Sequence, residues 1–298
     1  MVDATLWDEG EPRKPTHSCA GPTGGWGPKP NQLTLVGGGQ TMARLVRTIE
    51  GEIIPRLLLA LQSPPSSVAP EGRAVSAATA EDVNEFARLV ATHDVTVASE
   101  YVKALLDRGV SLEKVYLELL APAARLLGEW WKQDIRDFTE VTSGLCRMHQ
   151  LLHEFSSTFL IDARPAAPNR CVLLIPMPGD QHSFGLIMVA EFFRRAGWDV
   201  WDLHPSTADD VLAVVRRQWF AIVGVSLSCE SRLAELPPLI AAVRSHSRNR
   251  SLGVMVGGAP FNGHPERVNV VGADCTAIDG GSAPQVAGRL VSSLTRPA

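Results

Sequence analysis

Polar and apolar positions along residues 40–61 repeat with the period of a helix. Apolar residues recur at three- and four-residue steps from Met42 to Ile49, which predicts one amphipathic helix. Residues 1–39 before it are rich in glycine and proline, so we expect a flexible tail that buries little surface. A second proline-rich stretch follows, and residues 40–78 are therefore predicted to be a leading helix and a linker.

Residues 79–164 keep the helical period and carry little strand pattern. Thr79 has the character of an N-cap, and Ser111 is a candidate cap for a second helix. A further helix is expected from about Phe138 to Phe159. Together these segments predict a bundle of four or five helices.

In the last part of the chain, short apolar runs alternate with amphipathic stretches. The runs predict strands at 171–175, 199–203, 221–227, 252–256 and 275–278, and the stretches predict helices at 185–196, 208–217, 233–246 and 284–294. Strands that alternate with helices form a parallel sheet covered on both faces. The expected fold class is therefore α/β plus all-α: an N-terminal helical bundle, then a flavodoxin-like, doubly wound, five-stranded parallel sheet over residues 169–298.

Composition narrows the classes of function. The 298 residues include 28 Lys+Arg and 32 Asp+Glu, which gives a net charge of -4. We therefore do not expect the chain to bind nucleic acid directly, because such binding needs a clustered positive charge. No apolar run is long enough to span a membrane. Five scattered cysteines form no CxxC pair, and the acidic N-terminus lacks a secretory signal, so we expect reduced thiols and a cytoplasmic location.

The loop after the first predicted strand carries a pattern typical of a metal ligand. Asp180, His182 and Gly185 form D-x-H-x-x-G, with Ser183 between them. At the carboxyl end of a strand, the imidazole can face a metal while the aspartate accepts the proton of its other nitrogen. Gly185 would let a bulky group approach the backbone. The alternative interpretation is a solvated polar turn.

Two further loops are expected at the same edge of the sheet. The third strand ends with Ser226 and Ser228, and the fourth ends with the pair Gly257 and Gly258. Ligands of doubly wound sheets bind outside the carboxyl ends of the strands. A small hydroxyl group and two missing side chains there predict a slot for a long, nucleotide-like tail.

These three motifs in register resemble the signature of cobalamin-binding Rossmann-like domains, and the resemblance covers residues 170–298. It implies that His182 replaces the cofactor's own base as lower cobalt ligand and that Asp180 tunes it. It further implies that Ser226 bonds the displaced base, with Gly257, Gly258 and Gly280 on the cofactor. Ser228 departs from the family, which usually has leucine there.

The bundle contains a second pattern. Trp130 and Glu140 are separated by nine residues, which resembles the W-x9-EH pattern of cobalamin photoreceptor regulators, although Val141 stands in place of the histidine. The resemblance implies that Trp130, Trp131 and Glu140 cap the upper face of the cofactor. The alternative for the two tryptophans is core packing.

His149 and His153 lie four residues apart in a predicted helix and so share one face. They are candidates for an upper cobalt ligand or a haem ligand. The alternative is an exposed polar face.

Over residues 40–298 the chain resembles the PpaA/AerR group of bacterial antirepressors, most specifically in the strings EGEIIPRLLLA and GDQHSFG. The resemblance implies a non-enzymatic cobalamin sensor of light or redox state that regulates photosynthesis genes through a DNA-binding repressor of the PpsR/CrtJ type. The alternatives are a corrinoid carrier protein of a methyltransferase system and a haem-binding redox sensor.

Overall fold

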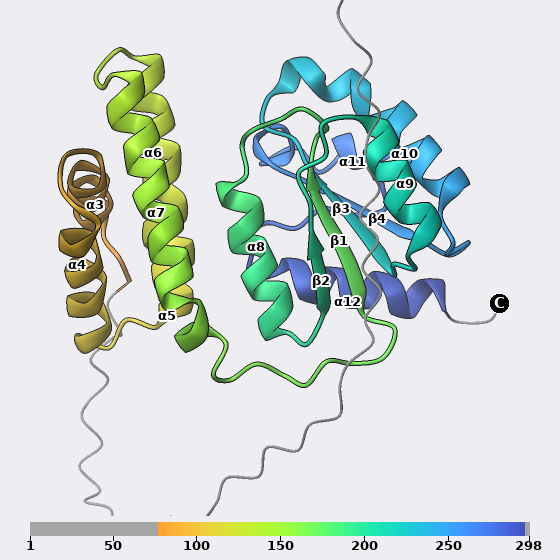
Figure 1. Ribbon diagram of the computed structural model, residues 1–298, viewed down its shortest axis with the longest axis horizontal. Helices are drawn as coiled ribbons and strands as arrows, with labels where there is room; N and C mark the ends of the chain where they lie inside the picture. Colours follow the sequence, from red (N-terminus) through yellow and green to blue (C-terminus); the bar gives the residue numbers. More distant parts are fainter. Residues whose placement is uncertain (1–76, 296–298) are drawn as a thin grey trace, which may run out of the picture. The chain divides into compact units, whose positions relative to one another are not determined.

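A computed structural model describes residues 77–295 of the chain (Figure 1). The predicted tail at residues 1–39, the leading helix and nearly all of the linker that follows it lie outside the described residues. The two predicted structural regions, the helical bundle and the parallel sheet, lie within them.

The N-terminal part of the described chain is helical, as predicted. Its elements are α3 (Ala80–Thr92), α4 (Val95–Asp107), α5 (Leu112–Lys114), η2 (Val115–Leu120), α6 (Ala121–Lys132) and α7 (Phe138–Phe159). Thr79 caps α3 in a reciprocal capping box with Asp82, and the Ser111 hydroxyl accepts the backbone N–H of Lys114 at 3.3 Å. The local polar signals therefore set the helix starts that the sequence predicted.

The helical segment from α5 to α6 contains a π-helical turn, which the sequence analysis did not predict. In η2 the N–H of Ala121 bonds to the carbonyl of Tyr116, five residues back. Pro122 follows directly and has no N–H to donate, and its ring would clash with the carbonyl of Glu118 in a regular helix. The wider turn accommodates this proline without ending the helix.

The C-terminal part is a parallel sheet with the strand order β2-β1-β3-β4. The strands are β1 (Cys171–Pro176), β2 (Asp199–Asp202), β3 (Ile222–Ser226) and β4 (Gly253–Gly257). The elements between and after them are α8 (Phe184–Arg195), α9 (Ala208–Arg217), η3 (Glu230–Glu235), α10 (Leu236–His246), η4 (Ala259–Phe261), α11 (Arg267–Val270) and α12 (Ala283–Leu294). Helices α8 and α12 cover one face of the sheet, and α9 and α10 cover the other (Figure 1).

The predicted fifth strand is wrong in extent. Of residues 275–278, only Cys275 pairs with β4, through an isolated parallel bridge to Met255. The Asp274 side chain accepts the N–H of Val254 at 2.6 Å, so a carboxylate takes a donor that a fifth strand would use. Ile278 is 94% exposed and adds no packing. The described residues therefore form a four-stranded sheet of the predicted class.

Helix α8 packs with both of its faces. Phe184, Met188 and Phe192 recur every four residues and join the hydrophobic core of the bundle, whereas Leu186, Ala190 and Phe193 pack on the sheet. The bundle and the sheet therefore share one helix as a common wall. This helix begins directly after the loop that carries the predicted ligand.

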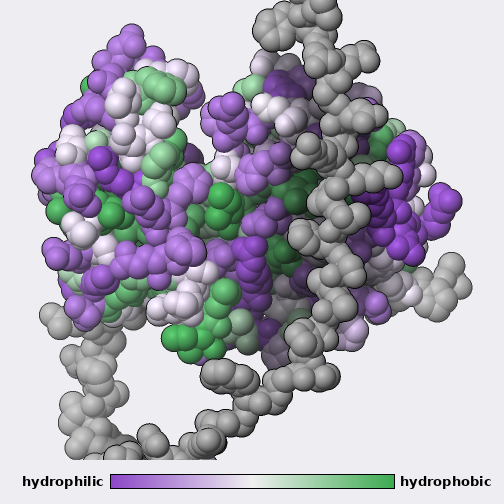
Figure 2. Space-filling view, viewed as in Figure 1, coloured by the Kyte–Doolittle hydropathy of each residue, from purple (hydrophilic) through white to green (hydrophobic). Residues whose placement is uncertain are grey.

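Among the described residues, no helix is long and apolar enough to cross a lipid bilayer. Hydrophilic residues are spread across the face of the molecule that Figure 2 presents, with smaller hydrophobic areas between them.

Candidate functional site

Three strand ends meet in register at the carboxyl edge of the sheet. Pro176 pairs with Ser226, and Ser226 pairs with Gly257. These positions share the sheet face that α8 and α12 cover, because alternate residues before them belong to the core on that side. The structure thus brings the three predicted loops together at one edge.

The loop after β1 holds the predicted histidine outward. Gly179 has a φ of 79°, and its N–H donates to the carbonyl of Pro205, so the chain turns sharply before Asp180. The Asp180 carboxylate accepts the His182 backbone N–H at 3.0 Å and its ring Nδ1 at 2.7 Å. The Asp180 side chain is 5% exposed, whereas that of His182 is 75% exposed.

This geometry determines which imidazole nitrogen is free. Burial acts to raise the pKa of Asp180, but hydrogen bonds from Ser228 and His182 outweigh it and hold that pKa below its usual value. The carboxylate is therefore ionised at neutral pH and can only accept hydrogen bonds. Nδ1 of His182 must carry the proton, which leaves the lone pair of Nε2 available to a metal.

Two residues that the sequence analysis did not assign to this contact also support the loop. Ser228, the departure from the family, provides a side-chain hydrogen bond that lowers the pKa of the Asp180 carboxylate. Arg232 donates to the carbonyl of Pro178 at 2.9 Å and is paired with Glu235. A hydroxyl at position 228 was the available signal for the first contact, whereas no local pattern indicated the second.

The glycines of the motifs have different roles. A Cβ added at Gly185 or Gly257 would meet no atom within 4 Å, so both positions open onto free space beside the loop. Gly258 has a φ of 99°, and a Cβ there would collide with the backbone of Leu227. Gly280 packs against Val189 and Phe192 of α8. The first two leave open space next to their own backbone, and the last two permit close packing.

The remaining predicted residue of this loop, Ser183, is the N-cap of α8 and makes no side-chain capping bond. Its carbonyl accepts the N–H of Ile187 at 2.9 Å. Ser183 therefore links the loop to α8, and its contact with a cofactor stays a prediction.

In the bundle, the two tryptophans that were predicted to cap the cofactor differ in burial. Trp130 is partly buried against the bundle core, with the Arg136 guanidinium 6.0 Å from its ring centroid, whereas Trp131 is 50% exposed. Glu140 accepts from Arg136 at 2.7 Å and closes the capping box of α7 with Asp137. Core packing thus accounts for Trp130 and helix capping for Glu140, and their cofactor role stays a prediction.

The two histidines on α7, His149 and His153, also have different surroundings. The ring of His149 bonds to the carbonyl of Leu145 through Nδ1 at 2.8 Å and packs edge-on against Phe184 at 5.2 Å between centroids. His153 is exposed. Only His149 therefore contacts the start of α8, one residue after the N-cap Ser183.

Comparison with known proteins agrees with this geometry. Residues 170–287 match the family model described as the B12 binding domain. Over this segment the chain is similar to B12-binding domains. The segment contains the exposed His182 imidazole and the motif glycines.

Two relatives extend the comparison. The chain is 28% identical over 170 residues to an uncharacterized 20.5 kDa protein in the bchF-crtJ intergenic region of Rhodobacter capsulatus, a match covering 57% of this chain and 88% of that protein. The fold is similar to that of a monomethylamine corrinoid protein from Methanosarcina barkeri, with a TM-score of 0.60 and 17% identity over 70% of this chain and 98% of that one. The predicted fold class and the predicted cofactor, cobalamin, are thus confirmed.

The residues of the B12-binding domain fit this cofactor. Cobalamin offers a cobalt ion that takes an imidazole nitrogen as a ligand and carries a long nucleotide tail. His182 supplies a free, exposed nitrogen, and the open positions at Gly185 and Gly257 leave room beside it. Among the described residues, no cluster of three or more His, Cys, Asp or Glu could hold a bare metal ion. A single imidazole suits a cobalt that brings its other ligands with it.

Proposed function

We propose that this chain is a non-enzymatic cobalamin sensor that regulates transcription through a protein partner. His182 would supply an imidazole ligand to the cobalt, Asp180 would orient that ring, and Ser226 with Gly257 would border the tail of the cofactor. The observation that carries the proposal is the exposed His182 ring held by the buried, ionised Asp180 carboxylate at the carboxyl edge of the sheet.

The regulatory part of the proposal is supported by gene context. The relative from Rhodobacter capsulatus is described by its position between bchF and crtJ. The resemblance of this chain to the PpaA/AerR group points the same way. The proposed partner is a DNA-binding repressor of photosynthesis genes, and the proposed signal is a light- or redox-driven change of the upper cobalt ligand.

The first test is retention of the cofactor. Full-length protein incubated with hydroxocobalamin and desalted should keep a corrin absorption spectrum. His182→Ala should lose most of it, because removal of the lower ligand leaves only the contacts to the ring and tail. His246→Ala, which changes an exposed histidine at the end of α10, is the matched control and should retain the cofactor. A colourless wild-type protein would rule out the proposed sensor.

The second test addresses the partner. The loaded protein should capture the repressor from a purified mixture, and illumination or a change of reductant should alter the captured amount. The same experiment with His182→Ala should show no response to the signal. Equal capture under every condition, with and without cobalamin, would exclude a cobalamin-dependent switch.

The alternative function is a corrinoid carrier of a methyltransferase system. Its support is the fold shared with the monomethylamine corrinoid protein. A carrier would accept a methyl group on cobalt from a donor in the presence of its methyltransferase and pass that group on. Stoichiometric methylation without any effect on a repressor would favour the carrier, and a Soret band in place of a corrin spectrum would favour haem.

A further inference from the structure

An open hollow lies at the edge of the sheet opposite to His182. It has a volume of about 560 Å³ along α12, between the residues that precede β1 and β2. Its lining includes Arg164, Arg170, Trp198, Gln285, Arg289 and Ser292. Arg170 and Trp198 directly precede the strands β1 and β2, so this surface lies at the amino ends of the parallel strands, away from His182.

The charges of this cavity are unbalanced. No ion pair among the described residues includes Arg164, Arg170 or Arg289, and no Asp or Glu lines the cavity. The lining thus contains three arginines and no carboxylate, a positive charge that favours an anion.

The frame around these arginines is ordered by its own contacts. The Arg164 N–H donates to the carbonyl of Arg195 at 2.9 Å, and the Ala167 N–H donates to the carbonyl of Gly197 at 3.1 Å. The Arg170 guanidinium lies over the buried ring of Trp198, 5.8 Å from its centroid. The linker before β1 is therefore held against the turn after α8, and the Arg170 guanidinium is positioned before any ligand binds.

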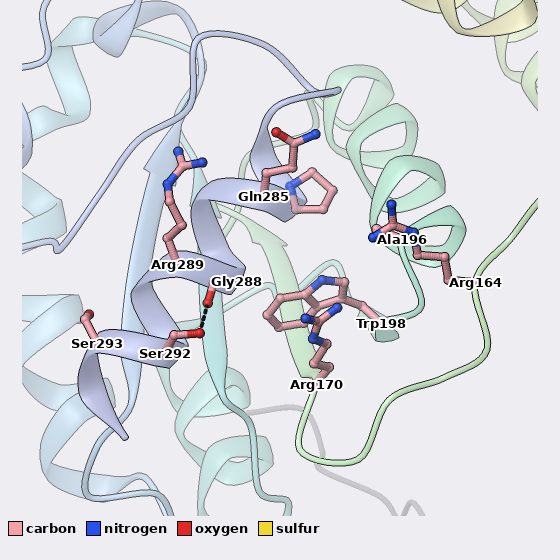
Figure 3. A pocket seen from close by; sticks show the side chains of 10 residues that line it. Arg164, Arg170, Ala196, Trp198, Gln285, Gly288, Arg289, Ser292 and Ser293 are labelled. Carbon is pink, nitrogen blue, oxygen red and sulfur yellow. Dashed lines mark hydrogen bonds between the residues drawn. The ribbon is translucent and has the colours of Figure 1, made fainter. Parts of the chain in front are cut away.

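The arginines approach the cavity from two sides. Arg164 and Arg170 lie with Trp198 on one side of α12, and Arg289 projects from the other side of the same helix (Figure 3). The Ser292 hydroxyl donates to the carbonyl of Gly288, which leaves its oxygen at the helix surface. A ligand that reaches the arginines on both sides must carry more than one anionic group.

We propose that this cavity binds a small anion with two or more phosphate groups, such as pyrophosphate or a nucleoside diphosphate. Guanidinium forks match phosphate oxygens with two parallel hydrogen bonds, and a volume near 560 Å³ is in the range of small-molecule sites. The net charge of -4 disfavours a nucleic-acid polymer in this role. The site does not depend on the proposed cobalamin function.

The test is calorimetric titration of the full-length protein with pyrophosphate and with ADP at constant ionic strength. We expect saturable binding that weakens at least tenfold in the double variant Arg164→Gln/Arg289→Gln. Arg170→Lys, which keeps the charge but loses the planar fork, should weaken it less. Arg216→Gln on α9, an exposed arginine outside the cavity, is the matched control and should bind like the wild type.

Three outcomes would overturn the proposal. They are no saturable binding of either anion at millimolar concentration, equal binding by the double variant and the wild type, and binding of a DNA duplex without binding of pyrophosphate. Corrin retention by the double variant provides the check on folding, because the cobalamin motifs lie at the other sheet edge. Retained corrin with lost pyrophosphate binding would support the proposal independently of the fate of the sensor hypothesis.

Discussion

Asp180 is the residue on which the proposed ligand depends. Its carboxylate is nearly inaccessible to solvent, yet it accepts from both the backbone and the ring of His182 and from Ser228. A buried carboxylate that accepts several hydrogen bonds stays ionised and orients its partners. The exposed histidine is thus directed by a group that solvent hardly reaches.

Removing these partners should weaken cobalamin binding in a graded way. Loss of an outer partner of a metal ligand typically costs about 10–100-fold in affinity, so we expect this range for Asp180→Asn. Ser228→Ala should cost less, about 3–10-fold, because the Asp180–His182 contact remains. Titration of apoprotein with hydroxocobalamin measures both, with Ser245→Ala on α10 as the control. A larger loss for Ser228→Ala than for Asp180→Asn would contradict this order.

Cys229 offers a second probe of the same edge. A hydrogen bond from Ser231, with smaller contributions from Ser228 and the Arg232 backbone, lowers the pKa of this exposed thiol. Burial instead raises the pKa of Cys171 to about 12 and that of Cys275 to about 11. Cys229 should therefore be the more reactive thiol towards an alkylating reagent at neutral pH.

Cobalamin loading should protect Cys229, because this residue follows Ser228 directly at the proposed binding edge. Alkylation mapped by peptide mass spectrometry, with and without the cofactor, measures the protection. Exposed Cys146, on α7, serves as the internal control. Equal labelling of Cys229 in the two states would place the cofactor away from this edge.

The contact between Asp180 and His182 could be predicted from the sequence because both residues lie in the same loop. D-x-H-x-x-G placed Asp180 two positions before His182, which is close enough for the observed contact. The contact from Ser228 joins two loops 48 positions apart, and only the strand register brings them together. Glu140 shows the opposite outcome. Its spacing from Trp130 suggested a contact with the cofactor, but in the structure its side chain caps helix α7.

At the scale of elements, helix bounds followed from local signals. The predicted bounds of α7 and α9 agree with the structure because a side-chain cap begins each helix and an apolar period runs through it. The prediction of a fifth strand was wrong because the Asp274 side chain accepts the backbone N–H of Val254, which a neighbouring strand would otherwise bind. The π-helical turn before Pro122 was missed because a continuing apolar period does not reveal a change of hydrogen-bond step.

The contact of α7 with α8 contains a buried carboxylate. Glu191 on α8 is 6% exposed and accepts from Ser156 of α7 at 2.6 Å and from Arg194 at 2.8 Å. Arg194 also reaches Asp202 at the end of β2. A polar network thus joins the bundle, α8 and the sheet within an otherwise apolar interface.

Glu191→Ala should destabilise the protein by about 1–3 kcal/mol, because Ser156 loses its acceptor and the network loses its centre. Urea unfolding monitored by circular dichroism measures the change. Glu129→Ala is the control, since Glu129 forms an exposed pair with Lys132 and should change stability by less than about 0.5 kcal/mol. If both substitutions lowered the free energy of unfolding equally, the network would not stabilise the protein.

At the scale of the whole molecule, α8 connects the ligand loop to the bundle. It begins two residues after His182, and its Phe184, Met188 and Phe192 lie in the bundle core. Phe192 also meets the ring of Tyr116 edge-on at 6.3 Å between centroids, and the buried Tyr116 hydroxyl has no hydrogen-bond partner among the described residues. A shift at the start of α8 therefore acts on a core that contains an unsatisfied polar group and a π-helical turn.

This connection predicts which elements change their hydrogen exchange when the cobalt ligand changes. When illumination or reduction alters the cofactor, hydrogen exchange should change in α8 and also in α7 and η2, because these elements pack against the far face of α8. Exchange in α9 and α10, on the other face of the sheet, should stay the same. Hydrogen–deuterium exchange of the loaded protein in darkness and light measures this, and His182→Ala should abolish the response. A change confined to the ligand loop would mean that the bundle does not receive the signal, and the repressor would then have to recognise the B12-binding domain itself.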